Sequence, residues 1–485
     1  MQTCFRPFNP AQLDSIHGAT LSVLKKTGLR VDCREFYPHL QEAGADVNRA
    51  TGVVKFPEKL IEETIIFFKG QIAGGRRQYL LNGVTNPRWT PPPGCKFGGA
   101  CIEYLDLQRN IVRKPEENDL IRLLQLGQAL EGVGFVGNPV ACLVDGEGRD
   151  VPPHMQRVKT AALVAKYTKK CGSTEVWNEK ELELLVEIGE IARDGRENYQ
   201  AAPCFVTAKE TIAPLQFPEE DGKILLMLAR RGLPCMIVPM PLAGVSSPCS
   251  IPANVVMANA EILGVLACIH AAAPNAMAGA GVISGILDMS SAVASFAAPE
   301  AIVQDAGLAQ LYDECYGQDL AIGTGYIDSK YPGVQAMLEK ACKMGAAAMQ
   351  GRFNFPLGLL AGGKRFCPEQ ALLDLEAASL LKKQHAGVDM DEGQIAEAVI
   401  NEAGIGGEFL SHVHTLENFG RNIWRPALMD RTAPSTLERE KSGDMFLPAS
   451  AKIREIWAQN DLYKIDDDRE KAIDEIVKKA ETILA

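Results

Sequence analysis

The stretch DLAIGTGYIDSK (319–330) carries the side chains best placed for chemistry. An apolar run, typical of a buried strand, passes directly into a polar, glycine-rich turn and then into a helix. The polar residues at this strand end are Thr324, Tyr326, Asp328, Ser329 and Lys330. In (β/α)₈ barrels the active site lies at the carboxyl ends of the strands. The pattern therefore predicts one βα unit of such a barrel, with Tyr326 and Asp328 orienting a bound ligand.

Other apolar runs end in polar or aromatic side chains in the same way. The predicted binding pocket comprises Phe97, Asn138, Thr207, Lys209, Glu210, Met240, Tyr326, Asp328, Gln350, Arg352 and Phe355. Glu175 and Trp177 occupy further strand-end positions. Ring faces and carboxylates attract a quaternary ammonium group, and Lys209 or Arg352 can hold a carboxylate on the same ligand. These residue types indicate a pocket for a small quaternary amine and no catalytic triad.

Metal and nucleophile motifs are missing from the sequence. The thirteen cysteines contain no CxxC pair, so zinc-ribbon and iron–sulfur spacings do not occur. His412 and His414 form an HxH in a helical segment, where we expect capping or interface hydrogen bonds in place of metal ligation. The sequence also lacks a GxSxG, a P-loop and a GxGxxG between a strand and a helix. No metal site is therefore predicted.

Strand and helix signals alternate from about residue 134, which requires a parallel sheet. Six runs predict strands at 135–142, 203–208, 234–240, 275–281, 319–325 and 355–361, and two candidates at 169–174 and 294–299 complete the eight. The helices between them carry end signals, such as Asn178 as an N-cap and Pro218 in a first turn. The sequence thus predicts an α/β fold whose catalytic domain is a (β/α)₈ TIM barrel over residues 134–386.

The flanking regions do not follow this rhythm. Residues 1–133 read as a smaller N-terminal α+β cap region, and residues 387–485 as a C-terminal helical extension that serves as a docking surface for a partner. The helix at 253–271 is uncharged except for Glu261. Such a helix is either deeply buried or part of an interface in a homo-oligomer.

Composition excludes several classes of protein. A net charge of −11 without a long basic run argues against nucleic acid as a partner. The first twenty residues lack the apolar core of a signal peptide, and we expect no segment that approaches the roughly 20 apolar residues of a membrane span. Cysteines within apolar runs suit a reducing compartment. We therefore expect a cytoplasmic protein with no membrane contact.

Several segments resemble, in the same order, the trimethylamine methyltransferase superfamily. They are HGATLSVLKKTGLRVDC (17–33), LQEAGADVNRATGVVKFPEKLIEETI (40–65), PMPLAGVSSPCSIPANVVMANAEILG (239–264), GTGYIDSKYPGVQAMLEK (323–340), FCPEQALLDLEA (366–377) and HVHTLENFGRNIWRPALMDR (412–431). The resemblance implies a (β/α)₈ barrel that transfers a methyl group from an amine to the cobalt of a separate corrinoid protein. Cobalamin would be carried by that partner, since this chain lacks a DxHxxG motif.

Family members that act on trimethylamine carry pyrrolysine, whereas this chain contains only standard residues. The resemblance therefore implies a quaternary amine of the betaine type as substrate, such as glycine betaine, proline betaine, carnitine or γ-butyrobetaine. A quaternary amine leaves as a neutral tertiary amine, so that the transfer requires no proton donor. The pocket would mainly orient the substrate and exclude water.

Two alternatives remain open from the sequence. The chain could be a non-catalytic barrel that binds quaternary amines or scaffolds the corrinoid protein. It could also be a lyase that forms a Schiff base through Lys330. The second alternative is weakened because no lysine is predicted squarely inside a strand.

Overall fold

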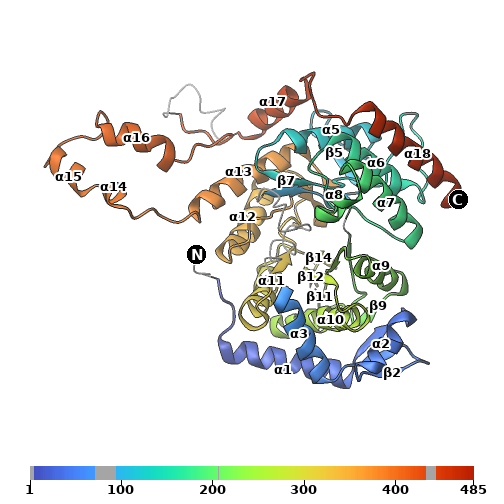
Figure 1. The fold of residues 1–485 in the computed structure, drawn as a ribbon. Helices are drawn as coiled ribbons and strands as arrows, with labels where there is room; N and C mark the ends of the chain where they lie inside the picture. The colour runs from blue at the N-terminus through green and yellow to red at the C-terminus, as the bar shows by residue number, and fades with distance from the viewer. Residues whose placement is uncertain (1–4, 72–93, 206, 433–443) are drawn as a thin grey trace.

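The computed structural model describes residues 5–71, 94–205, 207–432 and 444–485. The described helices are α1 (Pro10–Lys26), α2 (Tyr37–Glu42), α3 (Glu58–Gln71), α5 (Glu117–Ala129), α6 (Gln156–Tyr167), α7 (Glu179–Ala192), α8 (Arg196–Ala201), α9 (Glu219–Arg230), α10 (Ile251–Ala272), α11 (Pro299–Leu311), α12 (Val334–Met349), α13 (Pro368–Gln384), α14 (Glu392–Ile395), α15 (Glu397–Ala403), α16 (Val413–Asn422), α17 (Phe446–Trp457) and α18 (Asp467–Ile483). The fold is a mixture of helices and sheets, as expected for an α/β protein (Figure 1).

The strands are short, and several adjoin a glycine or proline. They are β1 (Leu29–Val31), β2 (Asp46–Asn48), β3 (Val53–Lys55), β4 (Cys95–Phe97), β5 (Glu103–Asp106), β6 (Ile111–Arg113), β7 (Val133–Val136), β8 (Ala208–Lys209), β9 (Gln216–Phe217), β10 (Pro234–Ile237), β11 (Leu242–Ala243), β12 (Met277–Val282), β13 (Gly285–Asp288), β14 (Val293–Ser295), β15 (Leu320–Ile322), β16 (Leu359–Leu360) and β17 (Arg365–Phe366).

A parallel sheet in the order β15-β12-β10-β8 forms the centre of the molecule. Its register places Met236 of β10 beside Gly279 of β12 and Ala208 of β8. Helices α9, α10 and α11 connect successive strands of this sheet, which is the arrangement that parallel pairing requires.

A second parallel group continues from the same region. Strand β4 pairs with β7, and isolated parallel bridges join Lys96 to Pro356 and Val136 to Cys171. The Phe205 N–H donates to the Gly172 carbonyl at 2.9 Å, which links this group toward β8. Among the described residues, no ladder joins β15 to the segment around Pro356.

One expected barrel strand is wrong, and the run at 355–361 is parallel only at Pro356, because β16 pairs antiparallel with β17. The run at 294–299 is not a parallel strand: β14 pairs antiparallel with β13 in a small sheet with β11. The reason is a tight turn in which Asp288 accepts hydrogen bonds from the hydroxyl groups of Ser290 and Ser291, so that the chain folds back on itself. Strand β4 provides a parallel neighbour instead, although it lies before the expected boundary at residue 133.

The N-terminal region packs its helices against α10. A small sheet in the order β2-β3-β1-β9 joins this region to the loop after β8, because β1 pairs in parallel with β9. Helix α10 lies against α1, α3 and α11, and its central residues are fully buried. By length and composition α10 could cross a membrane, contrary to expectation, but most of it is enclosed by the rest of the protein.

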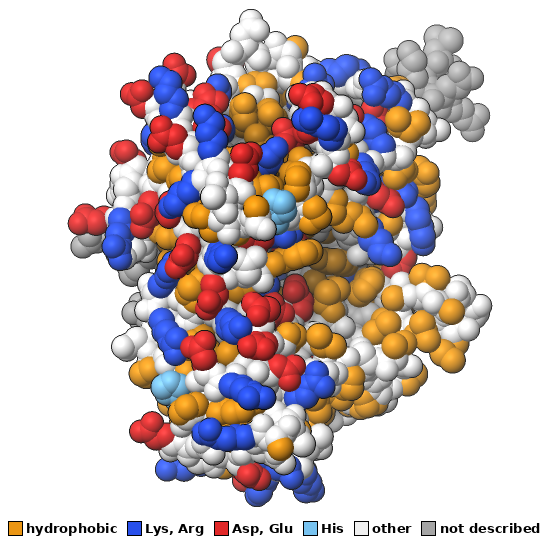
Figure 2. All heavy atoms as spheres, turned by 90° about the vertical axis from the view of Figure 1, so that its right-hand side faces the viewer, with side chains coloured by type: hydrophobic (Ala, Val, Ile, Leu, Met, Phe, Trp, Pro, Cys, Tyr) orange, Lys and Arg blue, Asp and Glu red, His pale blue; other side chains and the backbone are white. Residues whose placement is uncertain are grey.

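The C-terminal region divides into an arm and a returning pair of helices. The arm (386–432, including α14, α15 and α16) extends to the left of the body in Figure 1, with apolar side chains such as Ile405, Leu410 and Leu416 exposed. Helices α17 and α18 return to the body and pack on α5, α6 and α7. His412 caps α16 by accepting a hydrogen bond from the His414 N–H, as expected. In the face shown in Figure 2, acidic and basic side chains are interspersed, without an extended basic patch.

Candidate functional site

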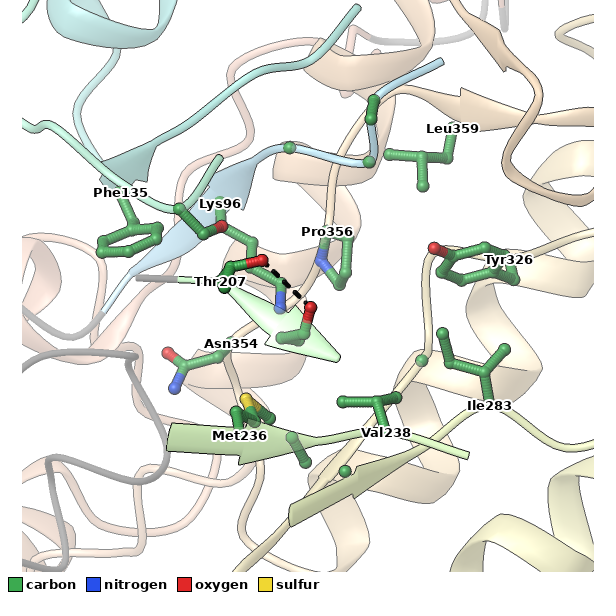
Figure 3. Close-up of a pocket in the computed structure, with 18 of the residues that line it drawn as sticks. Lys96, Phe135, Thr207, Met236, Val238, Ile283, Tyr326, Asn354, Pro356 and Leu359 are labelled. Atoms are coloured by element: carbon green, nitrogen blue, oxygen red, sulfur yellow. Dashed lines mark hydrogen bonds between the residues drawn. The ribbon is translucent and has the colours of Figure 1, made fainter. Parts of the chain in front are cut away.

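A cavity of about 240 Å³ opens at the carboxyl ends of the parallel strands. Its walls come from segments that follow or belong to β4, β7, β8, β10, β12 and β15, together with the chain around Pro356 (Figure 3). Barrel interiors are usually filled by branched side chains. Here Gly98, Gly281 and Gly323 lie on the lining, and at Gly323 a Cβ atom would come within 2.5 Å of Ile283. Small residues on the lining thus leave room for a ligand.

Lys96 is the unexpected residue of this cavity. It is the middle residue of β4, opposite Phe135 of β7, and its side chain points into the cavity (Figure 3). Desolvation lowers the pKa of the Lys96 ammonium group. Its ammonium has neither a hydrogen bond nor an ion pair to any residue within the described ranges. A lysine inside a short strand flanked by glycines is the signal that could have identified it.

Two carboxylates, Glu175 and Glu210, lie on the lining after the ends of their strands. Both side chains are exposed to the solvent that reaches the cavity. Surrounding protein atoms nevertheless raise the pKa of Glu210 to about 7, mainly by desolvation, and the nearby charges of Asp221 and Glu175 add to this effect. Desolvation also raises the pKa of Glu175. The two acids form the negatively charged part of the lining.

The loop after Glu210 is fixed by a buried carboxylate of α10. Glu261 accepts hydrogen bonds from the Thr211 hydroxyl at 2.5 Å and from the Leu215 N–H at 2.7 Å. The side chain of Glu261 is fully buried, and burial raises its pKa. The only acidic residue of this apolar helix therefore positions the segment that carries Glu210.

Tyr326 provides the aromatic wall expected from the sequence. Its ring lies 6.1 Å from that of Phe296, centroid to centroid, and packs on Gly363, where a Cβ atom would come within 2.5 Å of the ring. The Lys343 ammonium fixes the backbone by donating to the carbonyl oxygens of Phe296 at 2.7 Å and Tyr326 at 3.0 Å. Burial raises the pKa of the Tyr326 phenol, so that the ring is uncharged at neutral pH.

Five of the eleven predicted residues line the cavity: Phe97, Asn138, Thr207, Glu210 and Tyr326. Phe97 and Thr207 are almost completely buried in the wall. The Thr207 hydroxyl donates to the Ala208 carbonyl at 3.0 Å, as the dashed line in Figure 3 marks. The remaining six lie elsewhere.

Neither cation expected to hold a carboxylate faces the cavity. Ala208 and Glu210 line the cavity, and Lys209 lies between them along the chain. Because successive side chains of a strand point to opposite faces, Lys209 points away from the cavity. It pairs there with Asp221 of α9 at 2.7 Å. Arg352 precedes its strand instead of following it, and it forms a bidentate pair with Asp313 at 2.8 and 3.0 Å. Its Nε also donates to the carbonyl of Leu320, the first residue of β15. Arg352 therefore lies at the opposite end of the strands.

The other four residues have structural contacts. Asp328 accepts hydrogen bonds from the Ser295 hydroxyl and the Phe296 N–H, which ties the loop after β15 to β14. Gln350 donates to the carbonyl oxygens of Phe5 and Ala306. Phe355 is buried on the far side of the chain from Asn354 and Pro356, which line the cavity. Met240 lies beyond Met236 and Val238, which supply that part of the wall.

The described residues contain no group of three His, Cys, Asp or Glu side chains that could hold a metal ion. Lys330, the expected Schiff-base lysine, is exposed and does not line the cavity. The geometry is that of a small pocket with one lysine, two acids and an aromatic wall.

Comparison with known proteins gives a consistent result along the whole chain. The family described as Trimethylamine methyltransferase (MTTB) matches residues 2–484. The chain is 26% identical over 438 residues to the trimethylamine methyltransferase MttB of Desulfitobacterium hafniense (strain DSM 10664 / DCB-2), covering 88% of this chain and 84% of that protein. It is also 26% identical over 443 residues to the glycine betaine methyltransferase of D. hafniense (strain Y51), covering 89% of this chain and 88% of that protein. Among solved structures, the monomethylamine methyltransferase MtmB of Methanosarcina barkeri aligns with a TM-score of 0.46 and 10% identity, over 98% of this chain and 92% of that chain.

Proposed function

Because the chain belongs to the trimethylamine methyltransferase (MTTB) family, we propose that it transfers a methyl group from a methylated amine to the cobalt of a separate corrinoid protein. The observation that carries this proposal is the pocket at the strand ends, where Glu175, Glu210 and Tyr326 face one small cavity. Carboxylates and ring faces attract a methylated ammonium group. The names of the relatives, a trimethylamine and a glycine betaine methyltransferase, support the same class of reaction.

The proposal extends to the architecture. We propose that the strands close into a (β/α)₈ barrel that begins at β4 and ends with the chain around Pro356, in which case the expected boundary at residue 133 moves toward the N-terminus. The parallel contacts of β4 on both sides support this closure. The preceding residues then form the cap, and residues 387–485 form the extension proposed to dock the corrinoid protein. Cytoplasmic location and homo-oligomeric state stay predictions.

Within this class, the proposed substrate is a quaternary amine of the betaine type. The chain contains only standard residues, whereas the family resemblance implies pyrrolysine in members that act on trimethylamine. A relative named for glycine betaine is as similar to this chain as one named for trimethylamine. Which betaine binds depends on the shape of the cavity.

The size of the cavity supports a corrinoid that is carried by a separate partner protein and is not bound inside this chain. A cavity of about 240 Å³ has room for a small amine but not for a corrin ring. The reduced cobalt of the partner supplies the nucleophile when that protein is bound. The residues of this chain hold the ammonium group between Glu210 and the Tyr326 ring, exclude water, and keep one methyl group aimed at the mouth. The product leaves as a neutral tertiary amine.

An absorbance assay tests the proposal directly. The purified protein is mixed with cobalt(I) cobalamin or a reduced corrinoid protein and with glycine betaine, proline betaine, carnitine, γ-butyrobetaine, choline or trimethylamine. Formation of methyl-cobalt(III) with a quaternary amine is expected. Binding of an amine without any methyl transfer, with a cognate corrinoid protein present, would favour the non-catalytic binding or scaffold alternative.

A second candidate follows from Lys96. The Schiff-base reaction was weakened by the lack of a lysine inside a strand, yet Lys96 lies in the middle of β4 and burial lowers its pKa. A lyase would form a covalent imine with a carbonyl substrate at this lysine. Treatment with a small aldehyde or keto acid and borohydride would add a stable mass to the peptide that contains Lys96. We expect no such adduct from a methyltransferase.

A further inference from the structure

The charges of the cavity are arranged by depth. Lys96 lies within β4, one residue after its start. Glu210 follows the last residue of β8, and Glu175 lies four residues beyond the bridge at Cys171. In parallel strands that end at one mouth, residues inside a strand lie deeper than those that follow a strand end. The cavity therefore has a cationic inner part and an acidic outer part.

These opposite charges do not neutralise each other. Lys96 forms no ion pair with either acid, and desolvation alone accounts for the lowered pKa of its ammonium group. Desolvation raises the pKa of both acids, and the cations that oppose this rise lie outside the cavity lining: Arg157 and Lys209 for Glu175, and Lys209 for Glu210. A cation held in a cavity without a partner is unfavourable. A ligand that carries both a negative and a positive group would satisfy the two parts at once.

Resting on the proposed function, we propose that Lys96 binds the carboxylate of a zwitterionic methylated amine and so directs its methylated ammonium toward the mouth. The ammonium then lies between Glu175, Glu210 and the ring of Tyr326. This orientation is the productive one, because the corrinoid cannot enter the cavity and the methyl group must face outward. The reverse orientation would place the carboxylate against two acids.

The arrangement also predicts selectivity. A cation without a carboxylate leaves the Lys96 ammonium without a partner, and a site built for a polar group discriminates against analogues that lack it. Trimethylamine and choline should therefore be poor substrates, because neither has a carboxylate to pair with the Lys96 ammonium. Lys96 is thus a specificity-determining residue that touches the substrate but not the methyl group.

The experiment compares glycine betaine with its neutral amide, which has nearly the same shape but no carboxylate, and γ-butyrobetaine with the corresponding amide. Wild-type protein, Lys96→Met and Lys96→Arg are compared by isothermal titration calorimetry and by formation of methyl-cobalt(III). Lys330→Met is the matched control, since Lys330 is exposed and outside the cavity. Thermal unfolding of every variant establishes that it is folded.

We expect wild-type protein to prefer the zwitterion over its amide by at least about tenfold. Lys96→Met should abolish that preference by weakening the zwitterion, Lys96→Arg should keep most of it, and Lys330→Met should leave it unchanged. Equal losses for zwitterion and amide in Lys96→Met would overturn the inference, as would wild-type protein that binds no zwitterion. If zwitterions bind with the expected dependence on Lys96 but no methyl group is transferred, the proposed function fails and the carboxylate site stands.

Discussion

Lys340 and Lys96 both carry their ammonium groups into the interior, but the regions around them differ. Lys340 of α12 is fully buried and lies 2.9 Å from Asp374 of α13. Asp374 also accepts hydrogen bonds from the Gly358 N–H at 2.8 Å and the Gln370 amide at 2.7 Å. Lys96 faces a cavity and has no such partner within the described chain.

The difference separates structural charges from charges available to a ligand. In the interface between α12 and α13, one carboxylate is satisfied by a lysine, a backbone amide and a glutamine. In the cavity, Lys96 and the two acids are left apart. Burying a charge is costly unless it is paired. A cation that faces a cavity and has no partner among the described residues marks a position where a ligand anion can complete the pair.

The largest expected effect comes from breaking the paired region. Lys340→Met leaves Asp374 buried without its cation, and we expect the free energy of unfolding to fall by about 3–5 kcal/mol. Urea unfolding followed by circular dichroism measures the loss. Replacement of both residues, Lys340→Met with Asp374→Leu, should recover a large part of it. A single-variant loss below about 1 kcal/mol would contradict the assignment of this pair as structural.

Arg352, at the other end of the strands, provides a second test of the difference between paired structural charges and charges that face the cavity. Its bidentate pair with Asp313 is largely buried, so Arg352→Met should lower the free energy of unfolding by about 1–3 kcal/mol. Because Arg352 lies away from the cavity, the KM for a betaine should stay within about twofold of wild type. The measurement combines denaturant unfolding with steady-state methyl transfer at a temperature where the variant is folded. A selective rise in KM would instead place Arg352 in the binding site.

Glu210 predicts a pH dependence of binding. Its pKa is raised from 4.5 to about 7, so its carboxylate becomes fully charged only above neutral pH. Affinity for a methylated ammonium should therefore rise several-fold, about 1 kcal/mol, as the pH increases through about 7. Titration calorimetry from pH 6 to 8 measures this, and Glu210→Gln should give a flat profile. A parallel profile in the variant would assign the titration to another group.

The same shift has the opposite sign for stability. Between 4.5 and about 7 the folded protein holds the Glu210 proton more tightly than the unfolded chain does. The contribution of this group to stability is therefore fully present below pH 4.5 and is lost as the pH rises through about 7. The carboxylate that improves substrate binding is thus the less favourable form for the empty folded protein.

The smallest expected effect is the stability of Lys96→Met. Because Lys96 has no ion pair to any described residue, the free energy of unfolding should be within about 1 kcal/mol of wild type or higher. The same denaturation measurement on Lys340→Met provides the contrast. A loss as large as that of Lys340→Met would mean that Lys96 is a structural residue.

The ends of the strands could be predicted from the sequence more accurately than the directions in which their side chains point. Tyr326 and Glu210 could be predicted because they follow clear apolar runs. The sequence predicts Lys209 and Phe355 in the pocket, but both side chains point away from it. Neighbouring residues of a strand face opposite sides, and composition does not reveal at which residue a two-residue strand starts. Gln350 and Arg352 were assigned to the wrong end of their strand because the residues before and after it are equally polar.

Strand β4 was missed as a parallel strand for a related reason. It has only three residues, lies among glycines, and contains a lysine, so it lacks the continuous apolar character of a strand buried on both faces. The apolar run ASFAAP predicts a barrel strand, whereas the structure has the antiparallel β14 there. In both strands, the choice between parallel and antiparallel pairing depends on partner strands that the local sequence does not identify.

The exposed arm (386–432) separates, along the chain, the body of the protein from helices α17 and α18, which pack back on that body. Helix α18 is held on the body by buried Ile473 and Ile476 and by ion pairs of Asp474 with Lys166 and Lys479 with Glu187, and Trp457 of α17 donates to the Arg122 carbonyl. These contacts do not depend on the arm. A protease that cuts the arm should therefore yield two fragments that separate in denaturant but travel together through a sizing column, and the two coding segments could be expressed as separate chains that reassemble.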